Sequence, residues 1–234
     1  MTSPSNGSLN DIHFSTTCVI IFYLAQNLDV QSKVQVELDE ALGHEDDPIA
    51  SPEIVKRLPY LGAVINESFR LYSTSAIGLP RVVPEGGLYV SEKFFPEGTI
   101  LSVPSYTIHR DPDIWGADVE VFRPERWFEQ DRAGIQKTFN PFSYGPRSVE
   151  LRNCPLSLTK LGVNDRACVG KNLANMELQI FIATIFRRYM FVLEDPNKPV
   201  SHLTLNNPSP IECFACSLTR LRGSSVNLSR VELV

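Results

Sequence analysis

The sequence predicts a mainly α-helical protein with small β-sheets. Residues 15–42 and 53–71 carry apolar side chains at helical spacing, and residues 167–189 form a longer apolar stretch. Residues 73–104 instead consist of short β-type runs separated by Pro and Gly. We therefore expect helices first, then small strands, a long loop and a final helix.

The first part of the chain divides into a leader and two helices. Residues 1–14 form an atypical leader without the basic flank and apolar core of a secretory signal. Two helices are expected after it, joined near residues 27–29, and the second ends at Gly43. The apolar run 18–25 is too short to cross a bilayer, which needs about 20 residues. No membrane span is therefore expected in this chain.

The remaining elements follow from Pro, Gly and apolar content. Pro59 marks the beginning of a helix or a break within residues 53–71. Residues 105–147 are rich in Pro and are expected to be mostly loop. The helix expected at 167–189 is apolar on nearly every face, which indicates burial. Residues 201–234 are expected to form a divergent polar tail.

Composition excludes several classes of protein. A hydrophobic content of 43% and a charged content of 21% are typical of a globular chain. The net charge of −5 gives no reason to expect nucleic-acid binding, which requires a basic face. Five cysteines at irregular spacing do not suggest a disulfide framework, so we expect a reduced compartment.

One acidic and two basic residues are candidates for a charged cluster. Glu67 and Arg70 lie three residues apart on the helix expected at 53–71 and therefore share a face. A pair of this kind is usually a weak surface interaction. Apolar neighbours on the same face suggest partial burial instead, and Arg126 could complete a cluster with the pair.

The sequence His109-Arg110-Asp111 suggests a kinase catalytic loop, but this interpretation fails. The kinase motif requires Asn seven residues after the His, where this chain has Gly116. No glycine-rich loop precedes it.

Cys168 is the strongest candidate for chemistry. A cysteine at the start of a helix meets free backbone N–H groups and the positive end of the helix dipole, which favour the thiolate. Gly170 allows the backbone to approach a flat ligand, and Arg147 adds positive charge. The alternative is a buried structural cysteine.

Three motifs together resemble the C-terminal half of a cytochrome P450, a haem-thiolate monooxygenase, without its N-terminal half. They are ESFR at 67–70, FRPERW at 122–127, and FSYGPR at 142–147 with CVG at 168–170. The resemblance covers residues 15–200 as a partial domain. The finer likeness of the stretch from Ser73 to Pro112 is to the fungal branch of benzoate 4-monooxygenases.

The resemblance implies a haem b cofactor with an axial thiolate. Cys168 would be that ligand and the catalytic residue, and its sulfur would donate electron density that favours O–O cleavage. Phe142 would pack beside the sulfur, and Gly170 would lie against the haem. Arg81 and Arg147 would pair with the haem propionates through charge-assisted hydrogen bonds.

The resemblance also implies surroundings and partners. Glu67, Arg70 and Arg126 would form a structural cluster beneath the haem. Residues 73–83 would line the substrate-binding side of the site and would contact a small aromatic substrate. An NADPH-dependent cytochrome reductase would supply electrons. Relatives of this type lie on the cytosolic face of the endoplasmic reticulum membrane, and this chain, without an anchor, is expected in the cytosol.

The sequence departs from the family at two places. In the oxygen-activating helix the family has an acid followed by threonine, and Asp11 matches the acid while Thr16 and Thr17 come about one turn late. In the loop, one residue separates the family's Arg from its Cys, whereas residues 148–166 add nineteen here. An in-frame retained intron and a genuine surface insertion both explain that length. Cys154 lies within the extra segment but is followed by Pro155, so Cys168 is the favoured ligand.

Three functions from different classes follow. The leading hypothesis is haem-dependent monooxygenation of a benzoate-like aromatic acid. The alternative is a chain that is truncated, or translated from an incorrect gene structure, and that does not hold haem productively. A weaker third is a zinc or thiol site at Cys213 and Cys216, which lacks a second pair of ligands.

Overall fold

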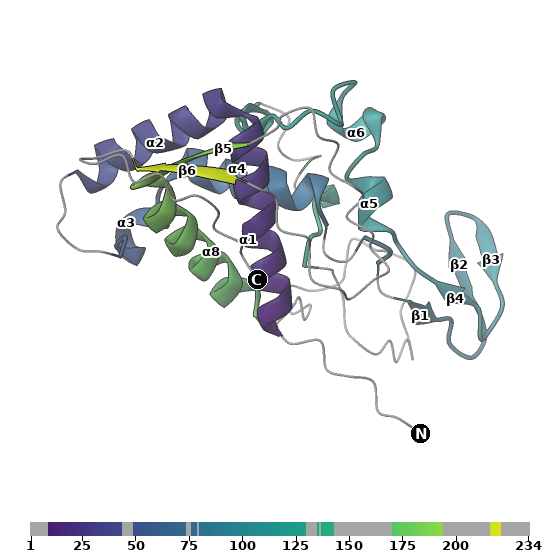
Figure 1. The fold of residues 1–234 in the computed structure, drawn as a ribbon. Helices are drawn as coiled ribbons and strands as arrows, with labels where there is room; N and C mark the ends of the chain where they lie inside the picture. Colours follow the sequence, from purple (N-terminus) through teal and green to yellow (C-terminus); the bar gives the residue numbers. More distant parts are fainter. Residues whose placement is uncertain are drawn as a thin grey trace.

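The computed structural model describes residues 9–43, 49–73, 76–78, 80–129, 135, 137–142, 170–193 and 216–220. Helices α1 (Leu9–Gln26), α2 (Leu28–Leu42), α4 (Pro59–Leu71) and α8 (Lys171–Phe186) pack together with the two-stranded sheet of β5 (Tyr189–Leu193) and β6 (Cys216–Arg220) (Figure 1). The mainly helical fold class with small sheets is confirmed.

The predicted helices at the start of the chain are confirmed, with one difference. The break falls at Asn27, and α2 ends at Gly43, whose φ of 53° suits a residue without Cβ. Helix α1, however, begins at Leu9, inside the predicted leader at residues 1–14. Residues 9–14 contain neither Pro nor Gly, so nothing stops the helix from extending backwards through them.

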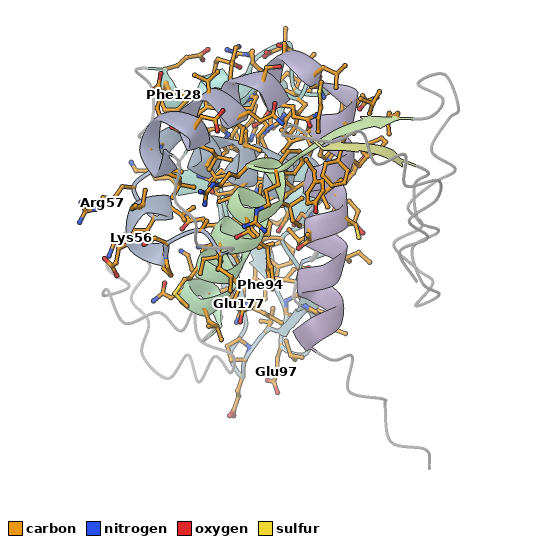
Figure 2. The ribbon with its side chains drawn as sticks, turned by 60° about the vertical axis from the view of Figure 1, so that its left-hand side comes forward. Lys56, Arg57, Phe94, Glu97, Phe128 and Glu177 are labelled. Atoms are coloured by element: carbon orange, nitrogen blue, oxygen red, sulfur yellow. The ribbon has the colours of Figure 1, made fainter. Side chains whose placement is uncertain are left out.

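Proline places the next two helices. Residues 53–71 contain the short helix α3 (Pro52–Val55) and helix α4, and Pro59 stands at the first turn of α4. There its missing N–H costs no hydrogen bond, because the first amides of a helix have no partner within it. Figure 2 shows Lys56 and Arg57 projecting outward after α3.

Small strands occupy residues 81–101, as predicted. Strands β1 (Arg81–Val82) and β4 (Ile100–Leu101) pair antiparallel, with Val82 opposite Ile100. Strands β2 (Leu88–Val90) and β3 (Lys93–Phe95) form a hairpin between them in the chain. In Figure 1 these strands lie apart from the helical core, on the opposite side of α1 from α8.

The loop after β4 contains three short helical turns. They are α5 (Ser105–Ile108), α6 (Pro112–Trp115) and the 3-10 helix η1 (Pro124–Phe128). Pro lies in the first turn of α6 and η1, which explains why these turns are short and begin where they do. The rest of the described part of this segment is irregular, as predicted.

The hydrophobic core lies between α1, α2, α4 and α8. Aliphatic and aromatic side chains that are at most 2% exposed fill it, namely Ile20, Leu24, Val34, Leu38, Leu61, Val64, Leu178, Ile182 and Phe186. Gln31 is also fully buried and joins α2 to β5, because its amide donates to the carbonyl of Phe191 at 2.9 Å and accepts from its N–H at 2.8 Å.

The predicted burial of the last helix is confirmed for one face, which includes Leu178 and Ile182, and is wrong for the opposite face. Leu173, Met176 and Phe181 of α8 are 54%, 45% and 53% exposed. Within the described residues, α8 packs on one side against the other helices, and an apolar sequence alone supplies no partner for its outer side. The helix also ends at Phe186 and not at 189, because the β-prone run of β5 begins at Tyr189.

The polar tail contains a strand that the sequence interpretation missed. Strand β6 pairs antiparallel with β5, with Tyr189 opposite Arg220 and Leu193 opposite Cys216. The pairing joins segments more than twenty residues apart, and a local polar pattern does not reveal such a partner.

Candidate functional site

Glu67 lies at the centre of a buried charged cluster. Its Oε1 accepts from Arg70 Nη2 at 2.8 Å and from Arg126 Nε at 2.9 Å. Its Oε2 accepts from Arg70 Nε at 3.0 Å. Glu67 and Arg70 are fully buried and Arg126 is 1% exposed, so the alternative of a weak surface pair is wrong.

Two further donors complete the shell around Glu67. The backbone N–H of Arg123 donates to Oε1 at 3.1 Å, and the indole N–H of Trp127 donates to Oε2 at 3.0 Å. The carboxylate thus accepts five hydrogen bonds, and three of them come from guanidinium groups, which form the stronger charge-assisted kind. The sequence interpretation missed Arg123 and Trp127, although both stand in the FRPERW motif.

Arg70 of α4 and Arg126 of η1 both donate to backbone carbonyls of the segment that follows α5. Arg70 Nη1 donates to the carbonyls of His109 at 2.9 Å and Val119 at 2.7 Å. Arg126 Nη1 donates to the carbonyl of Trp115 at 2.9 Å, and Nη2 donates to that of Asp118 at 3.1 Å. The cluster therefore holds a segment whose own regular structure is limited to the short helical turns α6 and η1.

Asp118 adds a second acid at the edge of this cluster. Its Oδ2 accepts from Arg123 Nε at 2.6 Å and from Arg126 Nη2 at 3.3 Å. Partial burial acts to raise the pKa of this carboxyl, but the hydrogen bond from Arg123 and the charge of Arg126 outweigh it and hold the pKa below its usual range. Asp118 is therefore ionised at neutral pH, and its negative charge offsets part of the positive charge of Arg123 and Arg126.

The two ends of the split loop meet in space. Phe142 packs edge-on against Phe69 of α4, with ring centroids 5.1 Å apart. The ammonium of Lys171, the first residue of α8, lies 5.8 Å from the centroid of the Phe142 ring, within cation–π distance. The described residues on either side of the segment 143–169 are thus brought together, although 28 positions separate Phe142 from Gly170.

The start of α8 fits the donor chemistry of a haem thiolate. Gly170 is the N-cap of this helix, and its carbonyl accepts from the N–H of Ala174 at 2.8 Å. A side chain just before a helix N-terminus meets unpaired backbone N–H groups and the positive end of the dipole, which favour a thiolate. Cys168 stands two residues before Gly170, but Cys168, Arg147 and Cys154 lie outside the described residues.

Arg81 and the segment expected on the substrate side lie in a different part of the molecule. Arg81 is on β1, opposite Leu101 of β4. Before β1, Gly78 approaches the backbone of Val103 so closely that a Cβ would lie 2.1 Å from the carbonyl oxygen. The neighbouring Ile77 is 66% exposed and presents an apolar surface.

Helix α1 carries the threonines that the sequence places late. Thr16 is 2% exposed on this helix, which packs against α4 and α8. Asp11 and His13 belong to the same helix. Of the other cysteines, Cys18 is buried on α1 and Cys216 begins β6, whereas Cys213 lies outside the described residues. No helix in the described ranges is long and apolar enough to cross a membrane.

Comparison with known proteins identifies the family. The sequence profile of the family Cytochrome P450 matches residues 13–148 and 162–213. Benzoate 4-monooxygenase bphA of Aspergillus niger is 39% identical over 188 residues, which are 79% of this chain and 32% of bphA. Cytochrome P450 monooxygenase hepC of Aspergillus oryzae is 37% identical over 157 residues, 66% of this chain and 26% of hepC.

A third relative gives the same result. Cytochrome P450 monooxygenase penB of Penicillium thymicola is 35% identical over 157 residues, 67% of this chain and 31% of penB. The chain spans about a third of the length of these relatives or less. The match covers most of the chain in the order of its motifs, and the chain belongs to the cytochrome P450 family.

Proposed function

We propose that this chain carries the haem-binding part of a cytochrome P450 monooxygenase, with Cys168 as the axial thiolate ligand of haem b. The observation that carries the proposal is the contact of Phe142 with Lys171, which brings both ends of the loop to the start of α8. When bound, the haem would supply the activation of O2, and the thiolate would favour cleavage of the O–O bond.

The residues of the chain have distinct roles in this proposal. Phe142 shields the sulfur of Cys168 from water, and its packing on Phe69 holds the ring in place. Gly170 lets the backbone approach the flat face of the haem. Arg81 and Arg147 pair with the propionates. The cluster of Glu67, Arg70 and Arg126 holds the segment below the haem and does not touch substrate.

The proposed substrate class is a benzoate-like aromatic acid. The identity of 39% to a protein named benzoate 4-monooxygenase supports it. The exposed apolar side chain of Ile77, next to the tightly packed Gly78, suits the flat face of a small ring. An NADPH-dependent cytochrome reductase is the proposed electron donor, and the cytosolic face of the endoplasmic reticulum is the proposed location of the whole enzyme.

A second candidate is a chain that does not hold haem productively. It is favoured by the nineteen extra residues at 148–166, which separate Arg147 from Cys168. Sequencing the transcript across codons 142–174 tests the origin of this segment, since a retained intron would be absent from mature message.

The two cysteines of the loop region give a matched test of the ligand. Purified chain would be titrated with haem, reduced, and exposed to CO, and the Soret band would be recorded for the parent, Cys168→Ala and Cys154→Ala. We expect a thiolate-type band in the parent and in Cys154→Ala and its loss in Cys168→Ala. The reverse pattern would assign the ligand to Cys154, and no thiolate band in any of the three would favour the second candidate.

A further inference from the structure

His109 joins the buried charged cluster to the segment that ends at Phe142. It follows α5 and has no exposed surface. Its carbonyl accepts from Arg70 Nη1 at 2.9 Å, and its ring Nε2 accepts from the backbone N–H of Asn140 at 3.1 Å. His109 thus contacts both the cluster around Glu67 and the segment of residues 140–142.

The ring of His109 is held by aromatic neighbours. Its centroid lies 5.4 Å from that of Phe139 and 6.0 Å from that of Trp115, which meets it edge-on. Trp127, which donates to Glu67, packs against the same Phe139 at 4.7 Å. The imidazole therefore has little freedom to turn, and its acceptor atom is aimed at a fixed position.

The hydrogen bond to Asn140 requires a neutral imidazole with its proton on Nδ1. Burial lowers the pKa of His109 to about 4 and outweighs the side chain of Asn140, which acts in the opposite direction. The charged groups that act on the ring are Arg70 of α4 and the adjacent Arg110, and both disfavour a further positive charge. His109 is therefore neutral near pH 7, and Nε2 is free to accept.

The anchored segment continues directly to Phe142. Asn140 is two residues before it, and its side-chain Oδ1 and the Nδ1 of His109 are buried without a hydrogen-bond partner among the described residues. The backbone bond to Nε2 is the polar contact that these residues show between the ring and the segment. Phe142 itself touches Phe69 and Lys171, so its position depends on where residue 140 is held.

We propose that His109 is a positioning residue whose ring Nε2 anchors Asn140 and thereby sets the place of Phe142 at the start of α8. The role in haem ligation rests on the proposed function, whereas the anchor itself does not. His109 touches neither substrate nor haem in this scheme. It acts through the backbone of residues 140–142.

Two substitutions separate the acceptor from the bulk of the ring. His109→Phe keeps an aromatic ring packed against Phe139 and Trp115 but has no nitrogen to accept the hydrogen bond from Asn140. His109→Gln loses the ring but can present its amide oxygen to the N–H of Asn140. Amide hydrogen exchange of the full chain without haem reads the anchor directly, and the amides of α8 serve as the internal control for global destabilisation.

We expect the amide of Asn140 to exchange at least tenfold faster in His109→Phe than in the parent, with α8 amides unchanged, and to return towards the parental rate in His109→Gln. In haem-loaded protein, His109→Phe should also lose haem faster than His109→Gln. An unchanged Asn140 amide in His109→Phe, or a Gln variant as fast as the Phe variant, would overturn the proposal. If the parent takes up no haem at all, the proposed function fails, and the exchange rates still decide the anchor.

Discussion

Replacing Glu67 by Gln should strongly destabilise the fold. Glu67 is fully buried and accepts five hydrogen bonds, three of them from the guanidinium groups of Arg70 and Arg126. An amide in its place removes the charge that balances these arginines. It also turns one acceptor atom into a donor, which would face the donors Arg70 Nε and Trp127 Nε1 or, after an amide flip, Arg126 Nε.

The magnitude follows from the burial of the partners. Removing one member of a buried ion pair costs about 3–5 kcal/mol, because an uncompensated charge is left in a region of low dielectric constant. Asp118 also contacts Arg126, at 3.3 Å, and relieves part of the imbalance, so we expect a loss near the lower end of that range. The measurement is urea-induced unfolding of the full chain, followed by far-UV circular dichroism.

Glu53→Gln is the matched control. Glu53 forms an ion pair with Lys56 at the same i,i+3 spacing, but both side chains are more than half exposed. Removing this pair should leave the free energy of unfolding unchanged within error, because water screens exposed charges. A loss of less than about 1 kcal/mol for Glu67→Gln, or equal losses for both variants, would refute the reasoning from burial.

Three further predictions concern stability. Gln31→Leu should lower the free energy of unfolding by roughly 2–4 kcal/mol, because it leaves the N–H and the carbonyl of Phe191 without their partner in the core. Gln35→Leu is the control and should cost less in the same urea assay, because the side chain of Gln35 donates only long hydrogen bonds of 3.3 and 3.4 Å. Gly78→Ala should cost clearly more than Gly98→Ala in thermal unfolding. Both have φ near +76°, a strain of about 1–2 kcal/mol, but only at Gly78 does a Cβ collide with backbone. The lowered pKa of His109 means that the folded state disfavours its protonation. Its contribution to stability is therefore present above pH 6.5 and is lost, by roughly 3 kcal/mol, as the pH falls towards 4. Unfolding free energies across this range should show a weaker fall in His109→Gln.

The sequence predicts the helices and the charged residues that meet, but not every contact around them. The i,i+3 spacing of Glu67 and Arg70 and the charge of Arg126 indicate a cluster, and these three residues lie together. The backbone N–H of Arg123 and the indole of Trp127 could not be assigned from sequence, because any amide or indole can donate and only the fold decides which one reaches Glu67.

The errors share a physical origin. Apolar content led to the expectation of a fully buried final helix, yet burial depends on partners on every side, and Leu173, Met176 and Phe181 lack them in the described part of the chain. Strand β6 was missed because its partner is distant in sequence. The sequence pattern relates His109 only to a kinase motif, because its role as an acceptor depends on a contact with Asn140, 31 positions away.

The most direct test of the central claim joins the loop. In a variant without residues 148–166, Ala167 alone separates Arg147 from Cys168. Haem titration followed by reduction under CO would be compared for the parent chain, the joined-loop variant, and the joined-loop variant with Cys168→Ala. If residues 142–147 and 168–170 form one haem-thiolate loop, the joined chain should bind haem more tightly than the parent and show the thiolate-type Soret band, and Cys168→Ala should abolish that band. A joined chain without the band, or a band that survives Cys168→Ala, would contradict the account.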